Sequence, residues 1–442
     1  MTTLKQYSKI KQDITKSMLT WHAFCYKHFV TSVYTYKEME RFELNNIIYS
    51  HSALVCFGEF LNKNFPYARV SFFVSSGLGA LISPYLQHAK SSGARVDLIE
   101  LTPTAFVCLN DINKLATNIY DNTRLLVAAG DKTTIEAVKL LARIKHIGVV
   151  VLPVPDIPID VLAGYVYVKS GEIFRRLECA SPCALFYDEG LVKTTGTQTI
   201  TNMAADMFSK ALLLFDARFA CCLGEDVDGF ELSALEQTLG AVLMCLKPAL
   251  LGDELAKTQL VEQAIVCAYH VSNLTVEGSA DNIFAAIKQI GKVSKQASAA
   301  LQLKCVGLLT SLYKRYLMHV NYVPQICDPI LRGVLVQTYL GEKHQKTMFE
   351  SIKNTYKLKE VLLANKDNLL TTITKVERLI SRIGNLLTDC QTSLTESEFG
   401  VALALAPEMS NKVNMLKILR NDGLTDFAIN KAINRLNLAP AV

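Results

Sequence analysis

The chain has 442 residues, of which half are apolar and 20% are charged, and its formal net charge is +5. These values are typical of a folded chain of two or three domains and exclude a disordered or low-complexity protein. The basic residues are scattered and no run of five like charges occurs, so the sequence predicts no nucleic-acid partner.

The cysteine pattern and the short apolar runs favour a location in the cytoplasm. The twelve cysteines include the pair Cys221-Cys222 but no CxxC spacing, which favours free thiols of a reducing compartment over a disulfide framework. No apolar run reaches the roughly 18 residues of a membrane span. The first residues lack the apolar core of a secretion signal. We therefore expect a cytoplasmic protein without membrane association.

The first part of the chain alternates between strand and helix patterns. Residues 1–40 predict a helical lead-in, and the alternation runs from about residue 45 to residue 153. The predicted strands are 45–50, 70–74, 96–101, 125–129 and 149–152. The predicted helices are 53–62, a segment through Leu81 and His88, 109–119, and a segment through Ile135 and Ala142. This alternation predicts a parallel sheet in an α/β layer.

The stretch from Arg124 to Pro153 predicts a strand–helix–strand unit with a turn at Gly130–Thr134. Its two strands must be parallel because a helix crosses between them. Ligands of such sheets bind at the carboxyl ends of the strands, where this turn lies. A turn that opens a helix can offer backbone N–H groups to a phosphate. Two interpretations stay open, an ordinary turn without a ligand and a contact with a nucleotide or phosphate.

A different pattern follows Pro153. A hairpin is predicted over 165–169 and 172–177, and a strand over 183–187 ends at Asp188. Beyond Thr197 only helices are predicted, at 199–216, 231–246, 253–272, 281–290, 294–319, 344–365, 366–389 and 409–420. The sequence therefore predicts a Rossmann-like α/β domain over 1–197 and an all-helical domain over 198–442.

Several segments match, in order, the motifs of one enzyme family. They are Gly130–Thr133 followed by Glu136 and Lys139, Pro158–Asp160, Phe186–Asp188, Ala204–Lys210 and Ala406–Met409. On these segments, residues 45–440 resemble the dehydroquinate synthase-like superfamily. That superfamily includes iron-containing alcohol dehydrogenases, glycerol dehydrogenases and glycerol-1-phosphate dehydrogenases, of which the last look most similar.

The resemblance implies hydride transfer between a nicotinamide, NAD or NADP, and a carbon of a small substrate such as a phosphorylated polyol. The cofactor-binding positions it implies are Gly130, Asp131, Lys132, Thr133, Thr134 and Asp160. Asp131 adds a negative charge where the pyrophosphate would lie, and pairing of Lys132 with the phosphate would offset it. Whether the chain forms a homo-oligomer is left open.

The metal-binding motif departs from the family pattern. Family enzymes hold Zn²⁺ or Fe²⁺ through one Asp and two His, and here Asp206, Asp281 and Gln302 stand at those positions. Oxygen donors suit Mg²⁺ or Mn²⁺ better than Zn²⁺, so a divalent metal is left in doubt. Simpler interpretations are a helix N-cap for Asp281 and a polar core residue for Gln302.

Two lysines could replace the metal as the positive charge beside a developing alkoxide, Lys210 and Lys304. The sequence therefore leaves two functions open. One is a dehydrogenase of this family without the usual zinc or iron site. The other is a catalytically inactive relative that serves as a binding or regulatory protein. A synthase-like carbocycle former is a weaker third, because the same imidazoles are missing.

Overall fold

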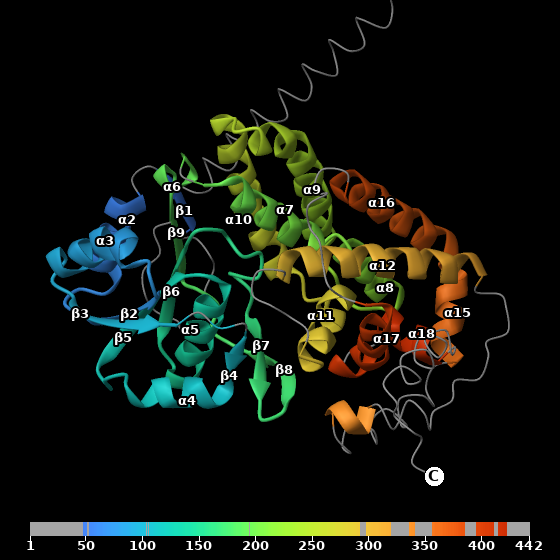
Figure 1. The fold of residues 1–442 in the computed structure, drawn as a ribbon, viewed down its shortest axis with the longest axis horizontal. Helices are drawn as coiled ribbons and strands as arrows, with labels where there is room; N and C mark the ends of the chain where they lie inside the picture. Colours follow the sequence, from blue (N-terminus) through green and yellow to red (C-terminus); the bar gives the residue numbers. More distant parts are fainter. Residues whose placement is uncertain are drawn as a thin grey trace, which may run out of the picture.

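The computed structural model describes residues 47–50, 53–102, 104, 106–193, 195–291, 298–319, 336–340, 356–384, 395–410 and 414–421. The predicted helical lead-in over 1–40 lies outside these residues. A sheet layer, at the left of Figure 1, is followed in the chain by a mostly helical region at the right. The predicted fold class is confirmed, and the predicted domain boundary at residue 197 stays a prediction.

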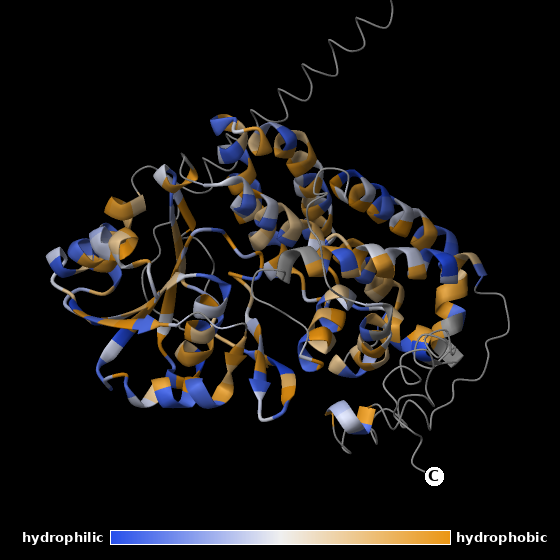
Figure 2. Ribbon diagram, in the orientation of Figure 1, coloured by the Kyte–Doolittle hydropathy of each residue, from blue (hydrophilic) through white to orange (hydrophobic). Residues whose placement is uncertain are grey.

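The main sheet has six parallel strands in the order β1-β9-β6-β5-β2-β3. Its strands are β1 (Ile47–Ser50), β2 (Arg69–Ser75), β3 (Arg95–Leu101), β5 (Thr123–Gly130), β6 (Gly148–Pro153) and β9 (Ala184–Asp188). β5 and β6 are buried over nearly their whole length, as expected for strands covered on both faces, and Figure 2 shows the sheet strands as mostly apolar.

Helices cover both faces of this sheet. The helices of the layer are α2 (Ala53–Asn64), α3 (Gly79–Ser91), α4 (Leu109–Thr117) and α5 (Lys132–Lys145). Leu125 and Val127 of β5 belong to the core under α2 and α3. Leu126 and Ala128, on the other face, belong to the core that includes α5 and continues into the helical region. The period-two alternation of β5 thus links both cores, and the predicted β5–α5–β6 unit is confirmed.

A small second sheet lies beside the first and contains β4 (Val107–Cys108), β7 (Tyr165–Ser170) and β8 (Ile173–Glu178). The antiparallel pair β7–β8 is the predicted hairpin, in which Ser170 pairs with Ile173. β4 was not predicted, because two residues are too few to show a strand pattern.

The helical region starts with α6 (Gly190–Lys193), α7 (Thr197–Ser209) and α8 (Leu213–Cys222). It continues with α9 (Gly229–Leu250), α10 (Glu254–Asn273), α11 (Ser279–Gln289), α12 (Ser298–His319), α15 (Tyr356–Ala364), α16 (Lys366–Gly384), α17 (Glu396–Leu405), the 3₁₀ helix η2 (Ala406–Met409) and α18 (Met415–Asn421). α16 is amphipathic, with alternating apolar and polar faces in Figure 2. Within the described residues, no helix combines the length and apolarity needed to cross a membrane.

Three helix predictions need correction. The single helix predicted over 199–216 is two helices, because Leu213 and Phe215 donate to the carbonyls three residues before them and tighten the chain into a turn. The helix predicted over 409–420 begins only at Met415. α17 was missed, although its Thr395 and Glu398 form a capping box that the sequence shows. Parts of the helices predicted at 294–319, 344–365 and 366–389 lie outside the described residues.

Candidate functional site

The turn between β5 and α5 lies at the carboxyl end of the sheet and is packed against β2. Gly130 has φ +143°, and a Cβ atom there would lie 2.0 Å from Ser75 Oγ, so only glycine fits. Ser75 Oγ accepts the N–H of Asp131 at 3.1 Å and shares a hydrogen bond with the Thr134 hydroxyl at 2.7 Å. The carboxylate of Asp131 caps α5 by accepting the Thr134 N–H at 3.0 Å. The backbone N–H groups of Asp131 and Thr134, at the start of α5, are therefore already hydrogen-bonded to side chains of the protein.

Replacing Gly130 with alanine is expected to lower the free energy of unfolding by roughly 2–5 kcal/mol, because overpacking and an unfavourable φ add together. Urea denaturation followed by circular dichroism measures this change. Gly196→Ala is the matched control, since a Cβ at Gly196 meets no atom within 4 Å. Equal stability of the two variants would contradict the close packing of Ser75 on Gly130.

Lys132 leaves the turn and reaches Asp160, in the loop that follows β6. Its Nζ lies 2.8 Å from Asp160 Oδ2. The second carboxylate oxygen, Oδ1, lies 2.9 Å from Nζ of Lys210. Burial alone would raise the pKa of Asp160, but the two ammonium groups outweigh it and hold that pKa well below its usual range. Asp160 is thus an ionised carboxylate between two lysines, and Lys132 is engaged by it.

Lys210 is the centre of this group of charges. It caps the carboxyl end of α7, its side chain is only 1% exposed, and its Nζ donates to Asp281 Oδ1 at 2.7 Å. Burial lowers the pKa of Lys210, but Asp160 and Asp281 raise it well above its ordinary value. An ammonium has three N–H donors, and the third has no partner among the described residues. We refer to Lys132, Asp160, Lys210 and Asp281 as the Lys210 cluster.

Of the other two predicted metal ligands, Asp206 supports the loop of this cluster, and no contact links Gln302 to the cluster among the described residues. Asp206, one helical turn before Lys210 on α7, accepts the N–H of Ile159 at 2.9 Å and so fixes the loop that carries Asp160. Gln302 on α12 is buried, and its Oε1 has no hydrogen-bond partner among the described residues. Within those residues, no three His, Cys, Asp or Glu side chains are grouped to hold a metal ion. The role of Asp206, Asp281 and Gln302 as ligands stays a prediction.

The structure disagrees with the predicted N-cap role of Asp281 and does not place Lys304 beside Lys210. Asp281 does not cap α11, because the N-cap is Gly278 and the Asp281 carboxylate binds Lys210 instead. Lys304 is exposed on α12 and has no contact with the Lys210 cluster, so the structure does not bring the two predicted catalytic lysines together.

Several residues at the cluster were not predicted as site residues. Lys139 is fully buried and donates to the carbonyl of Asp160 at 3.0 Å, and only its place in the turn motif pointed to it. Burial raises the pKa of Tyr165, and the negative charge of Asp160 raises it further. Burial lowers the pKa of Lys288, although the negative charges of Glu136 and Asp160 act in the opposite direction. Tyr165 starts β7 and Lys288 lies on α11, and the pKa of each responds to the charge of Asp160. No spacing in the sequence links them.

Asp216 on α8 supports the helix that carries Asp281. Its carboxylate accepts the Ser279 N–H at 2.7 Å and the Ser279 hydroxyl at 2.6 Å, at the start of α11. Burial nevertheless raises the pKa of Asp216 to about 7. A raised pKa means that the folded state holds the proton more tightly than the unfolded state, whose pKa is about 3.9. The stability contributed by this group is therefore lost as the pH rises from about 4 to 7.

We expect Asp216→Asn to remove this pH dependence. Relative to the wild type, the free energy of unfolding of the variant should be higher at pH 8 than at pH 5 by about 1–3 kcal/mol. Urea denaturation at both pH values gives the difference. An identical difference at pH 5 and pH 8 would show that Asp216 does not titrate in this range.

The Lys210 cluster is not arranged like a metal site. A divalent ion held by Asp281 would stand beside the Lys210 ammonium, which already neutralises that carboxylate, so the cluster does not fit a metal. A cavity of about 310 Å³ lies beside the turn, lined by Thr102, Thr104, Cys108, Asp111, Thr133 and Thr134 among others. This hollow has the hydroxyl donors and the room for a nucleoside. Asp131 opposes a nucleotide, because its charge faces any phosphate at α5.

No protein-family model and no curated protein sequence matches the chain. Solved structures do match it over nearly its whole length. An iron-containing alcohol dehydrogenase from Thermotoga maritima has a TM-score of 0.57 and 9% identity, covering 87% of this chain and 98% of that one. Glycerol dehydrogenase from Schizosaccharomyces pombe has a TM-score of 0.54 and 12% identity, covering 92% and 95%. An archaeal alcohol dehydrogenase from a Red Sea brine pool has a TM-score of 0.61 and 12% identity, covering 91% and 100%.

At these identities the comparison shows the fold. The parallel sheet, the hairpin and the helical second half agree with what the motifs implied. This chain therefore has the fold of the iron-containing alcohol dehydrogenases and glycerol dehydrogenases, which belong to the dehydroquinate synthase-like superfamily.

Proposed function

We propose that this chain is an oxidoreductase of the dehydrogenase fold that works without a resident metal ion and acts on a small hydroxylated, phosphorylated substrate. The observation that carries the proposal is the position of Lys210. Its ammonium is held by Asp160 and Asp281, at the carboxyl end of the sheet, and its third N–H donor has no partner among the described residues. A fixed positive charge of this kind can do the electrostatic work for which a metal ion would otherwise be needed.

The cost of the buried charges supports a retained function. Exchanging a buried ion-pair group for apolar side chains is often neutral or stabilising, so stability alone does not require these charges. Strongly perturbed pKa values gather at functional sites. Here Asp160, Lys210 and Asp281 come from three separate segments and converge at the end of the sheet where ligands of this architecture bind.

A bound nicotinamide would accept or supply the hydride. The protein's own groups would prepare the substrate. In carbonyl reduction, the third N–H of Lys210 would donate to the substrate carbonyl oxygen and stabilise the alkoxide that forms as the hydride arrives, and that alkoxide would then take a proton from water. In the oxidation direction, the hydroxyl proton would pass to water and the hydride would leave the carbon of the alkoxide. Asp160 and Asp281 would hold the ammonium in place, and the Ile159 hydrogen bond to Asp206 would keep the Asp160 loop from moving. Tyr165, at the cluster, also lines a cavity of about 930 Å³ through which a substrate could approach.

Lys288 is the residue that favours a substrate with an anionic group. Its side chain has no ion pair with a carboxylate among the described residues and lies 4.9 Å from the centre of the Phe284 ring. Burial lowers its pKa, so its charged form lacks full compensation in the protein alone. A phosphate would supply the missing charge.

A second candidate function is a catalytically inactive relative that binds a ligand or regulates a partner. The hydrogen-bonded set of Ser75, Asp131 and Thr134 favours it, because these side chains take up part of the helix end that a pyrophosphate would use.

The test is an assay of NAD⁺ and NADP⁺ reduction with sn-glycerol 1-phosphate, sn-glycerol 3-phosphate and glycerol, in the presence of a chelator. The proposal predicts turnover of a phosphorylated polyol that the chelator does not inhibit, loss of turnover in Lys210→Met, and normal turnover in Lys304→Met. Melting temperatures of the same mixtures detect binding without turnover, because a ligand of the folded state stabilises it by mass action. Binding of a polyol phosphate without cofactor reduction would favour the second candidate.

A further inference from the structure

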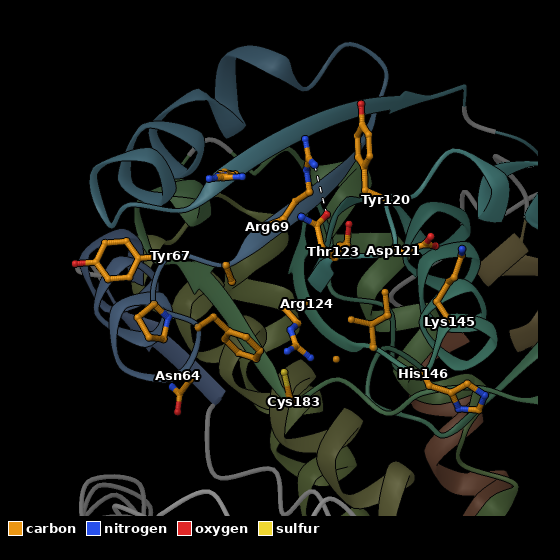
Figure 3. A pocket seen from close by; sticks show the side chains of 17 residues that line it. Asn64, Tyr67, Arg69, Tyr120, Asp121, Thr123, Arg124, Lys145, His146 and Cys183 are labelled. Carbon is orange, nitrogen blue, oxygen red and sulfur yellow. Dashed lines mark hydrogen bonds between the residues drawn. The ribbon is translucent and has the colours of Figure 1, made fainter.

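A third hollow lies at the other end of the sheet, opposite the end that holds the Lys210 cluster. Its volume is about 740 Å³, and residues at the amino ends of β2, β3, β5 and β6 line it, with the last residues of α2 and α5. Parallel strands place their amino ends at one edge and their carboxyl ends at the opposite edge. This hollow is therefore distinct from the candidate active site, and Figure 3 shows it from close by.

Arginines lie in the first two positions of three neighbouring strands at this edge. Arg69 of β2 pairs in register with Arg95 of β3, and Arg124 is the second residue of β5. Arg69 is held in place, since its Nε lies 2.9 Å from Asp97 Oδ2 and its guanidinium lies 3.7 Å from the centre of the Tyr120 ring. Arg95 and Arg124 are exposed and have no ion pair or hydrogen bond to another described side chain. Two guanidinium groups are thus free beside one that is fixed.

The backbone of β5 is irregular at Arg124. Arg69 pairs with Thr123 and Val70 pairs with Leu125, so Arg124 is the extra residue of a bulge. Bulges redirect a side chain and occur often beside binding sites. In Figure 3 the Arg124 side chain lies in the middle of the hollow, near Cys183, with Lys145 to one side and Tyr67 to the other.

The rim has a second irregularity at Tyr67. This residue has φ +56°, a backbone conformation that residues other than glycine rarely adopt. Its side chain is 82% exposed. Its ring lies against Gly93, where a Cβ would come within 2.9 Å of it. Strained residues of this kind gather at ligand-binding positions. Lys145 lies in the last turn of α5, where a positive charge complements the helix dipole. Its presence there is therefore explained by the helix itself.

We propose that this hollow is a binding site for a nucleoside polyphosphate, with the phosphates held by Arg124, Arg95 and Lys145 and the base stacked on Tyr67. Guanidinium groups bind phosphate through paired hydrogen bonds, and aromatic rings stack on bases of any sequence. The volume lies in the range of small-molecule sites, and Asp121 is the one acidic residue among its described lining. The site is independent of the proposed oxidoreductase activity.

The experiment is isothermal titration calorimetry of the full chain with ADP, ATP, tripolyphosphate and adenosine. We expect ATP and ADP to bind, tripolyphosphate to bind more weakly, and adenosine alone to bind weakly or not at all. Arg124→Gln should lower the affinity for ATP at least about tenfold, because it removes a charge-assisted phosphate contact. Tyr67→Ala should lower the affinity for ATP but not for tripolyphosphate. Arg218→Gln, which changes an exposed arginine on α8, is the matched control and should change neither.

Three outcomes would overturn the proposal. One is the absence of heat with ATP and tripolyphosphate at millimolar concentration. The second is ATP binding that Arg124→Gln leaves unchanged, which would place the nucleotide at the α5 turn or elsewhere. The third is a 20-nucleotide single-stranded RNA that binds far more tightly than ATP and requires Arg124, which would make the hollow part of a nucleic-acid surface. Circular dichroism of Arg124→Gln confirms that a loss of binding is not a loss of folding.

Discussion

Replacing Lys210 with methionine is expected to lower the free energy of unfolding by about 3–5 kcal/mol at neutral pH, because it removes the partner of buried charges. Methionine keeps most of the length and volume of the side chain but leaves Asp281 without its hydrogen-bond donor and Asp160 with Lys132 alone. Urea denaturation measures the loss. In the same variant, reduction of a nicotinamide cofactor should disappear.

The effect of this substitution should depend on pH in a defined way. The pKa of Lys210 is raised, so its contribution is present below the unfolded value of about 10.4 and is lost as the pH rises through the folded value. The pKa of Asp160 is lowered by its two lysines, so its contribution is present above about 3.9 and is lost as the pH falls through the folded value. The difference between wild type and variant should be largest between roughly pH 4 and pH 10.

Lys304→Met is the control, since this exposed lysine lies outside the cluster and its loss should change stability by less than about 0.5 kcal/mol. If the two variants unfold at the same urea concentration, Lys210 does not carry the charge balance described above.

Replacing Asp131 with asparagine is expected to increase the affinity for NAD(H) or NADP(H) by about tenfold, or ~1.4 kcal/mol. Asparagine caps a helix about as well as aspartate, so α5 should keep its first turn. The negative charge that faces the pyrophosphate is removed, and the helix end becomes more favourable for an anion. Titration of the intrinsic protein fluorescence with NADH, at low and high salt, measures the change.

Asp121→Asn removes an exposed acidic charge at the opposite end of the sheet and is the control for net charge. Unchanged or weaker dinucleotide binding by Asp131→Asn would mean that no pyrophosphate approaches α5. That result would favour the inactive relative over the dehydrogenase.

The fold could be predicted where one pattern decides the structure. The apolar run of β5, the glycine at Gly130 and the amphipathic spacing of α5 agree with one another, and the β5–α5–β6 unit follows from them. The break between α7 and α8 could not be predicted, because residues 203–217 are buried on every side and apolar residues continue through the turn. Periodicity shows a helix only when one of its faces is polar.

The sequence indicated which residues belong to the site, but not which of them contact one another. The motif resemblance pointed to Asp160, Lys210 and Asp281, yet 71 positions separate the last two, and their 2.7 Å contact depends on how α11 packs. The sequence suggested that Lys132 pairs with a phosphate, whereas in the structure it pairs with Asp160. Local sequence does not determine which of several nearby partners a long, flexible lysine side chain selects.

In the proposed enzyme, the Lys210 ammonium takes the place of a metal ion. The most direct test is the metal content of the purified 442-residue chain. It is measured by inductively coupled plasma mass spectrometry after dialysis without chelator, and again after loading with Zn²⁺, Fe²⁺ or Mn²⁺. We predict no stoichiometric metal in any sample and an unchanged melting temperature after loading. One zinc, iron or manganese ion per chain, lost together with activity on chelation, would contradict it.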